Sequence, residues 1–235
     1  MSIADLRRDY SLTGMRRRDL ADDPIEQFKR WFDQALGVRA GGRVRSFFVR
    51  LYKAVFLLAN PGPVDVNAMT LATADAEGRP SARVVLLKGV DERGFIFFTN
   101  YESRKGQELA ANPHAALVFY WANQERQVCI AGTVSQLPEE ESVAYFKTRP
   151  RGSRLAAWAS NQTSVVPDRA ALDQAWDKME AEHAGKEIPK PAYWGGYLLR
   201  PQRMEFWQGR PNRLHDRFRY TRLPNDQWQI ERLAP

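Results

Sequence analysis

The stretch RVVLLKGVDERGFIFFTNYESRK, residues 83–105, is the most informative part of the chain for its fold. It contains two runs rich in β-branched and aromatic residues, 83–88 and 95–99, joined by the polar connection Asp91-Glu92-Arg93-Gly94. Short runs of this kind, separated by a polar segment that ends in glycine, predict a β-hairpin. Turn-forming residues follow at 100–103 and predict a helix that begins near residue 104.

Four cations stand at the ends of these predicted elements: Arg83, Lys88, Arg104 and Lys105. Strand ends and helix N-termini also expose backbone N–H groups, so the arrangement favours a phosphorylated ligand. The alternative is a half-buried hairpin whose long cationic side chains reach water at its rim. The stretch by itself leaves both interpretations open.

Length and charge limit the class of protein. The chain has 235 residues, which is enough for one domain with a substantial core. Its net charge of +7 favours anionic partners such as nucleic acid, acidic lipid or phosphorylated metabolites. The first residues contain no apolar run after their charges, so no secretory signal is predicted.

Cysteine and histidine usage excludes several kinds of site. The single cysteine, Cys129, lies in an apolar run and is predicted to be a buried, unreactive thiol. One cysteine excludes an internal disulfide and fits a reducing, cytoplasmic compartment. Three scattered histidines cannot complete a zinc site with it, so no metal is expected. The nucleophile elbow, the phosphate loop and the dinucleotide fingerprint are also absent from the sequence.

Charge and periodicity divide the chain into a basic arm (1–23), a helical segment (24–66) and a β-rich part (67–235), all within a single domain. A helix is predicted from Pro24, and Gly37 ends it. Within the unusual segment 38–63, apolar and basic residues at helical spacing predict a second helix over 43–58. We expect its wide apolar surface to pack within the protein or a dimer, and membrane binding is not expected.

The rest of the chain alternates between strand and helix patterns. Strands are predicted at 68–74, 115–121, 126–137, 194–200, 204–208 and 217–233, the last divided by a turn at 224–226, and helices at 102–111, from 138 onward and at 168–184. Many short strands with inserted helices indicate an α+β protein built on a small antiparallel barrel with peripheral helices.

Two further polar clusters could carry chemistry. Tyr145, Arg149 and Ser153, on a predicted helix end and the loop after it, would suit a phosphate monoester, unless Arg149 pairs with Glu141. Arg213, His215 and Arg217 would share one side of an extended segment. A lone histidine is more often structural than catalytic, but the flanking arginines favour a functional site.

Several motifs in order resemble the pyridoxine/pyridoxamine 5′-phosphate oxidase family. They lie at residues 83–88, 99–105, 125–127, 145–153, 206–209, 213–217 and 232–235. The resemblance covers nearly the whole chain except residues 38–63, which are longer than the family leads us to expect. It implies a split β-barrel of the FMN-binding type over residues 67–235, and a homodimer with its active sites at the subunit interface.

The resemblance also implies roles for single residues. Noncovalent FMN would be held by Arg83, Val84, Val85, Leu86, Leu87, Lys88, Phe98, Thr99, Arg104, Lys105, Gln127, Gln162, Thr163, Trp207 and Arg217. The substrate would be held by Arg7, Tyr10, Lys88, Tyr145, Arg149, Ser153, Arg213 and His215, of which Arg7 and Tyr10 cover the site. Arg213 and His215 would act at the reacting carbon. Two positions depart from the family pattern, with Phe98 in place of a tyrosine and Thr163 in place of a serine.

The activity that the resemblance implies is oxidation of pyridoxamine or pyridoxine 5′-phosphate to pyridoxal 5′-phosphate. The substrate would stack on the flavin, which takes up a hydride equivalent from C4′, and O₂ would then be reduced to H₂O₂. One alternative is a related FMN enzyme that acts on another small aromatic substrate. A second is a basic nucleic-acid-binding barrel, which would need aromatic side chains exposed on a strand face.

Overall fold

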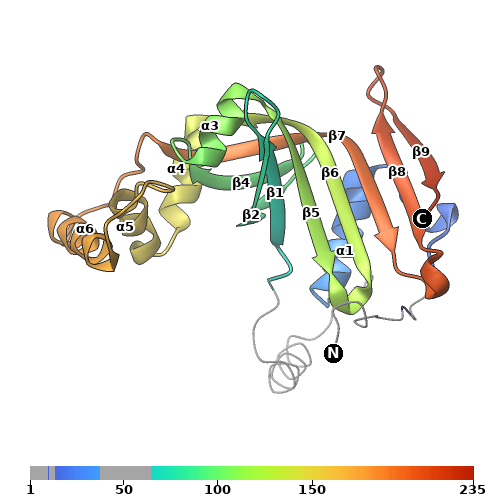
Figure 1. Cartoon of the computed structure of the whole chain (residues 1–235), viewed down its shortest axis with the longest axis horizontal. Helices are drawn as coiled ribbons and strands as arrows, with labels where there is room; N and C mark the ends of the chain where they lie inside the picture. Colours follow the sequence, from blue (N-terminus) through green and yellow to red (C-terminus); the bar gives the residue numbers. More distant parts are fainter. Residues whose placement is uncertain (1–9, 11–13, 38–64) are drawn as a thin grey trace. The chain divides into compact units, whose positions relative to one another are not determined.

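The computed structural model describes residue 10 and residues 14–37 and 65–235 (Figure 1). Arg7 and the predicted helix over 43–58 lie outside the described residues. The chain divides into two compact units. The first unit falls within residues 1–69, 117–130 and 202–235, and the second unit comprises residues 70–116 and 131–201. The three-part division expected from the sequence stays a prediction.

The strands of the structure join in one antiparallel path, β2-β1-β5-β6-β7-β4-β3, with β8 paired to β7 and β9 to β8. Their bounds are β1 Ala68–Ala74, β2 Pro80–Leu86, β3 Gly89–Val90, β4 Phe95–Asn100, β5 His114–Trp121, β6 Arg126–Gln136, β7 Trp194–Gln208, β8 Asp216–Arg222 and β9 Trp228–Leu233. The two strands predicted over 194–208 are therefore one continuous strand, β7, which contributes to both units.

The α-helices are α1 Pro24–Ala35, α3 Arg104–Ala111, α4 Glu139–Thr148, α5 Arg151–Ala159 and α6 Arg169–Glu182, and short 3-10 turns lie at Arg17–Asp19 (η2), Ala122–Gln124 (η3) and Pro211–Arg213 (η4). The helices predicted near 24, 102, 138 and 168 are confirmed. Helix α5 was not predicted, because Gly152 weakens its local helical pattern. It is stabilised by tertiary packing, since Leu155 is fully buried against Phe146 and Trp194. Within the described residues, no helix is long and apolar enough to cross a membrane.

The predicted hairpin between residues 83–88 and 95–99 is partly wrong. The hairpin is formed by β3 and β4, with Gly89 opposite Ile96 and Val90 opposite Phe95. Strand β2, which contains Arg83, pairs with β1 instead. Periodicity identifies a strand by its local pattern, but the choice of its neighbour depends on side chains far away in the sequence.

Helix α1 and the β-strand residues around it form the core of the first unit. Asp23 caps the helix by accepting a hydrogen bond from the backbone N–H of Ile25 at 2.6 Å. Phe28 packs edge-on against Phe119, with ring centroids 5.0 Å apart, and Trp31 does the same against Phe206 at 5.2 Å. Edge-to-face pairs of this kind add about 0.5–1.5 kcal/mol each to the burial of their apolar area.

The second unit has two apolar centres. Phe95 and Phe97 of β4 are fully buried beside Leu199 of β7. Phe146, Leu155, Ile188 and Trp194 form a second cluster under α4, α5 and α6. Helices α5 and α6 lie side by side (Figure 1). This second cluster carries the residues 145–153 that the sequence analysis singled out.

Candidate functional site

The residues predicted for the site belong to both units. The second unit holds Arg83, Val84, Val85, Leu86, Leu87, Lys88, Phe98, Thr99, Arg104, Lys105, Tyr145, Arg149, Ser153, Gln162 and Thr163. The first unit holds Tyr10, Gln127, Trp207, Arg213, His215 and Arg217.

Lys105 lies at the centre of a polar group at the N-terminus of α3. Its Nζ donates hydrogen bonds to Gln162 Oε1 at 2.7 Å, Thr99 Oγ1 at 3.2 Å and Ser103 Oγ at 3.2 Å. All three acceptors are uncharged. Burial, together with the nearby charge of Arg83, lowers the pKa of Lys105 to about 8. The structure thus brings together residues that lie up to 63 positions apart in the sequence.

Thr163 connects the 161–164 turn to the first residue of α3. Its Oγ1 accepts a hydrogen bond from the backbone N–H of Arg104 at 2.9 Å. Its φ of +76° lies in the left-handed region, which is strained for a β-branched residue. The Thr163 hydroxyl therefore holds the start of α3, although its branched side chain is strained in this backbone conformation.

A carboxylate that the sequence analysis missed neutralises part of this charge. Glu108 forms ion pairs with Arg83 at 3.2 Å and with Arg104 at 2.8 Å. Arg104 and Glu108 are four residues apart on α3, a spacing that brings side chains together on one helix face and could have indicated the pair. We call Arg83, Arg104, Lys105 and Glu108 the cation cluster.

Strand β2, which contains Arg83 of the cation cluster, also exposes apolar side chains to solvent. Val84 is 69% exposed and Leu86 is 39% exposed, whereas Leu87 is buried. Lys88, just after the strand, is exposed as well. Exposed apolar side chains on one face of a strand fit a ligand ring or a partner surface.

Arg149 lies among aromatic rings in the second unit. Its Cζ is 4.6 Å from the centre of the Trp194 ring, and one of its terminal nitrogens, Nη1, is buried without a hydrogen-bond partner among the described residues. Burial lowers the pKa of this guanidinium. The alternative pairing of Arg149 with Glu141 does not form, and Glu141 binds Arg93 at 2.8 Å instead.

The rings next to Arg149 are stacked. Phe98 lies on Tyr145 with centroids 3.9 Å apart and 19° between planes, and on Trp194 at 5.4 Å. The ring face of Phe98 makes these contacts, so the loss of the hydroxyl expected there does not disturb them. Ser153 lies within α5 rather than in a loop, which corrects the predicted secondary structure.

In the first unit, Tyr10, Trp207 and His215 form a cluster of three rings. Tyr10 meets Trp207 edge-on at 5.3 Å and His215 at 5.4 Å, and Trp207 lies 4.7 Å from His215. The backbone N–H of Arg210 donates to His215 Nδ1 at 3.1 Å. This leaves the proton of the neutral imidazole on Nε2, where it can be donated to another group.

The expectation that Arg213, His215 and Arg217 share one side of an extended segment is wrong. Arg213 lies in the turn η4 with φ +60°, and β8 begins only at Asp216. Pro211 starts this turn and prevents a strand from forming there. Arg217, on β8, binds Glu205 at 2.8 Å, which raises its pKa.

Gln127 donates from Nε2 to the sulfur of Cys129 at 3.3 Å. Cys129 is half-buried rather than buried, because the sheet position leaves part of it accessible. Burial raises the pKa of its thiol, which disfavours the reactive thiolate and supports the expected low reactivity.

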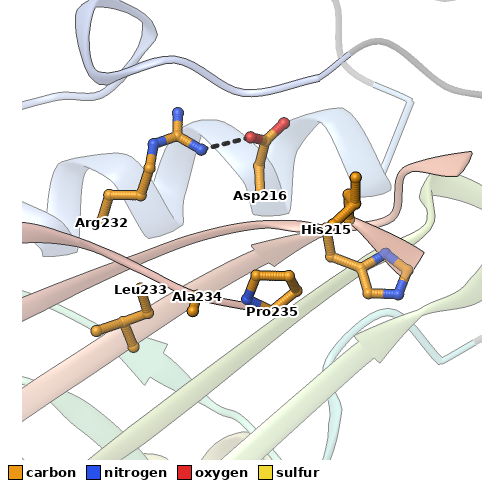
Figure 2. A pocket seen from close by; sticks show the side chains of 7 residues that line it. His215, Asp216, Arg232, Leu233, Ala234 and Pro235 are labelled. Atoms are coloured by element: carbon orange, nitrogen blue, oxygen red, sulfur yellow. Dashed lines mark hydrogen bonds and ion pairs between the residues drawn. The ribbon is translucent and has the colours of Figure 1, made fainter. Parts of the chain in front are cut away.

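A pocket of about 420 Å³ opens beside His215 and the chain end (Figure 2). Leu214, His215, Asp216, Arg232, Leu233, Ala234 and Pro235 line it. Arg232 binds Asp216 at 2.6 Å, as the dashed line in Figure 2 marks. Burial opposes ionisation of Asp216, but hydrogen bonds from Arg232 and from the backbone of Met15 outweigh it and lower its pKa.

Comparison with known proteins identifies the family of this chain. Residues 63–183 match the family model described as pyridoxamine 5′-phosphate oxidase, and residues 194–235 match the pyridoxine 5′-phosphate oxidase C-terminal dimerisation region. A pyridoxine/pyridoxamine 5′-phosphate oxidase of Salinibacter ruber is 53% identical over 99% of both chains. One from Ralstonia nicotianae is 52% identical over 100% of this chain, residues 38–63 included, and 99% of its own length.

Two solved structures share the fold. PhzG from Burkholderia lata, in complex with tetrahydrophenazine-1-carboxylic acid, is 32% identical with a TM-score of 0.80 and covers 97% of this chain and 100% of its own. A pyridoxamine 5′-phosphate oxidase-related, FMN binding protein from Nostoc punctiforme is 21% identical with a TM-score of 0.59, over 79% and 97% of the two chains. The α+β split-barrel fold is therefore confirmed, and the chain belongs to the pyridoxine/pyridoxamine 5′-phosphate oxidase family of oxidoreductases.

Proposed function

We propose that this chain binds FMN noncovalently and oxidises pyridoxamine 5′-phosphate, pyridoxine 5′-phosphate or both to pyridoxal 5′-phosphate, with O₂ as electron acceptor and H₂O₂ as product. The cation cluster is the observation that carries this proposal. Arg83 and Arg104 share one carboxylate there, and Lys105 pairs with no acid among the described residues, so positive charge remains in excess at a helix N-terminus. A phosphate monoester, the group common to FMN and both substrates, fits that excess.

The residues present fit FMN. Arg104 and Lys105 would hold its phosphate, with Gln162 and Thr163 fixing their positions through the hydrogen bonds described above. The exposed apolar side chains of β2 would contact the flavin ring. The remaining members of the proposed FMN set are Arg83, Val85, Leu87, Lys88, Phe98, Thr99, Gln127, Trp207 and Arg217. Bound FMN would supply a two-electron acceptor, which no protein side chain here offers.

Arg149 is the main anchor that we propose for the substrate phosphate. Its buried Nη1–H group has no acceptor among the described residues, and a buried unpaired donor costs about 1–3 kcal/mol. A substrate phosphate would satisfy it with a charge-assisted bond. Lys88, Tyr145 and Ser153 would supply the neighbouring donors.

His215 and Arg213 are the residues that we propose for the reacting end of the substrate. His215 can donate from Nε2, because its Nδ1 accepts from the Arg210 backbone. It would hold the amino or hydroxyl substituent of the reacting carbon in place, and Arg213 would orient the same group. Tyr10, which contacts the His215 ring, would help to exclude water together with Arg7.

We further propose that the enzyme is a cytoplasmic homodimer with its active sites at the subunit interface. The match of residues 194–235 to a dimerisation region supports the dimer. The single cysteine favours a reducing compartment.

A second candidate is oxidation of another small aromatic substrate by the same cofactor. The likeness to PhzG, whose structure contains tetrahydrophenazine-1-carboxylic acid, favours testing it. A carboxylate has fewer oxygens than a phosphate and would leave some of the donors of Tyr145, Arg149 and Ser153 without a partner. We therefore place this candidate second.

Purified protein should be yellow and should release FMN on heating. With pyridoxamine or pyridoxine 5′-phosphate it should form pyridoxal 5′-phosphate and an equal amount of H₂O₂. A colourless protein that does not bind added FMN contradicts the cofactor. A yellow protein that oxidises tetrahydrophenazine-1-carboxylic acid but neither vitamer would support the second candidate instead.

A further inference from the structure

Glu108 of α3 is a buried carboxylate that accepts hydrogen bonds from four side chains. It is 5% exposed. Its Oε2 accepts from Thr73 Oγ1 at 2.5 Å, Ser81 Oγ at 2.6 Å and Arg83 Nη2 at 3.2 Å. Its Oε1 accepts from Arg104 Nε at 2.8 Å. All of these residues lie in the second unit.

This carboxylate stays charged. Burial by itself would raise the pKa of Glu108, but the hydrogen bonds from Ser81, Thr73, Arg104 and Arg83 lower it to about 2. A buried charge normally destabilises a protein unless its partners compensate for the lost hydration. Here four donors from two strands and one helix compensate for the lost hydration and keep the carboxylate ionised.

The contacts of Glu108 fix the two arginines of the cation cluster. The Arg83 guanidinium donates to Thr73 Oγ1 at 2.6 Å, to the Leu71 carbonyl at 3.2 Å, to Ser81 Oγ and to Glu108. The Arg104 side chain is 64% exposed, and the bond to Glu108 holds its Nε in place. Without Glu108, Arg104 would be a flexible surface side chain.

Glu108 also sets the charge of the cluster. Arg83, Arg104 and Lys105 with one carboxylate leave two net positive charges, which equals the charge of a phosphate monoester dianion. Lys105 makes no ion pair with an acid of the described part of the chain. In the described chain it is therefore the cation of the cluster that lacks a carboxylate partner, whereas Arg83 and Arg104 share the carboxylate of Glu108.

We propose that Glu108 is a positioning residue for FMN, which orients Arg83 and Arg104 and leaves Lys105 to pair with the FMN phosphate. The inference rests on the proposed function, because it concerns the phosphate end of the same site. Glu108 itself touches the cations and not the cofactor, since its carboxylate oxygens are occupied by the four donors.

The test compares FMN with riboflavin, which lacks the phosphate, in wild type and Glu108→Gln. Dilution of the holoenzyme, followed by the fluorescence of released flavin, gives the Kd of FMN, and displacement of FMN by riboflavin gives the second Kd. Glu108→Gln should weaken FMN binding about 10- to 100-fold and riboflavin binding less than about twofold. Tighter FMN binding would mean that only net charge matters, and equal loss for both flavins would mean a general structural role; either overturns the proposal.

The pH dependence of FMN binding is a second measurement. It would not change if Glu108 only stabilised the fold. The charge of Glu108 raises the pKa of Lys105, so its removal lowers that pKa further. The pH above which FMN affinity declines should shift downward in Glu108→Gln. An unchanged pH profile contradicts the proposal.

Two other variants complete the experiment. Glu102→Gln removes an exposed carboxylate from the turn before α3 and should change neither Kd nor the pH profile. Ser81→Ala removes one donor to Glu108 and one acceptor of Arg83, and it tests the same positioning of Arg83 if Glu108→Gln does not fold. It should weaken FMN binding about three- to tenfold with riboflavin unaffected, and wild-type affinity for FMN would overturn the proposal. Failure of the wild-type protein to bind FMN would instead reject the proposed function.

Discussion

The backbone N–H of Arg210 donates a hydrogen bond to Nδ1 of His215 at 3.1 Å. A main-chain donor cannot rotate away, so the bond fixes both the orientation of the imidazole and the position of its proton on Nε2. The ring is held further by edge-on contact with Tyr10 and by Trp207.

The first prediction concerns His215. His215→Ala should lower kcat about 100-fold, because it removes the hydrogen-bond donor that we propose for the reacting carbon. His215→Gln, which can place an N–H near the former Nε2, should retain more activity than the alanine variant. Steady-state rates of peroxide formation measure both. Equal activity of the two variants would reject the donor role of Nε2.

Arg149 should act mainly in binding. Arg149→Ala should raise KM about 10- to 100-fold with a much smaller change in kcat, because the phosphate contact exists in both the ground state and the transition state. FMN content, read from absorbance, should stay near the wild-type value. Loss of FMN from this variant would contradict the assignment of Arg149 to the substrate.

Arg213 should act on the chemical step. Arg213→Ala should lower kcat as well as kcat/KM, because a group that orients the reacting carbon contributes mostly in the transition state. Its FMN content should also be unchanged. A normal kcat with a raised KM would place Arg213 with Arg149 instead.

Lys105 predicts a pH dependence of FMN affinity. Burial and Arg83 lower its pKa from 10.5 to about 8 in the folded chain, whereas a bound phosphate would favour the charged form. FMN affinity should therefore be highest below about pH 8 and decline above it, as holoenzyme dilution at several pH values would show. Lys105→Gln should bind FMN more weakly and lose this dependence between pH 7 and 10.

The lowered pKa of Lys105 also affects the stability of the FMN-free chain, which should rise with pH where FMN affinity falls. Between pH 8 and 10.5 the unfolded chain keeps a proton on Lys105 that the folded chain has lost. The contribution of this group to stability therefore rises with pH through that window and is least favourable below it. Thermal unfolding of FMN-free wild type and Lys105→Gln should differ most below pH 8.

We expect the substitution Thr163→Ser to stabilise the protein. Thr163→Ser keeps the oxygen that accepts from the Arg104 N–H and removes the branched methyl group from a residue at φ +76°. It should raise the free energy of unfolding by about 0.5–1 kcal/mol. Thr163→Val is the matched control, because it keeps the branch and loses the acceptor, and it should destabilise. A lower Tm for Thr163→Ser would reject strain at this position.

The family, the α+β class and most of the helices and strands could be predicted from the amino-acid sequence. The Asp23 cap of α1, the turn before α3 and the alternation in β4 all act over a few residues, and these three elements formed where expected. The motif residues near Arg104 and Tyr145 were found in the same way, because their type and spacing are visible in the chain.

Which of these residues contact one another depends on the tertiary packing. Glu141 binds Arg93, 48 positions away, so Arg149 keeps a buried donor without a partner in the described chain. Glu108 reaches Thr73 across 35 positions, and β2 pairs with β1 instead of β4. Local patterns specify helices, strands and turns because their hydrogen bonds and side-chain periods are local. Ion pairs and strand neighbours depend on how distant segments pack, and that packing is what gives the cation cluster its charge and shape.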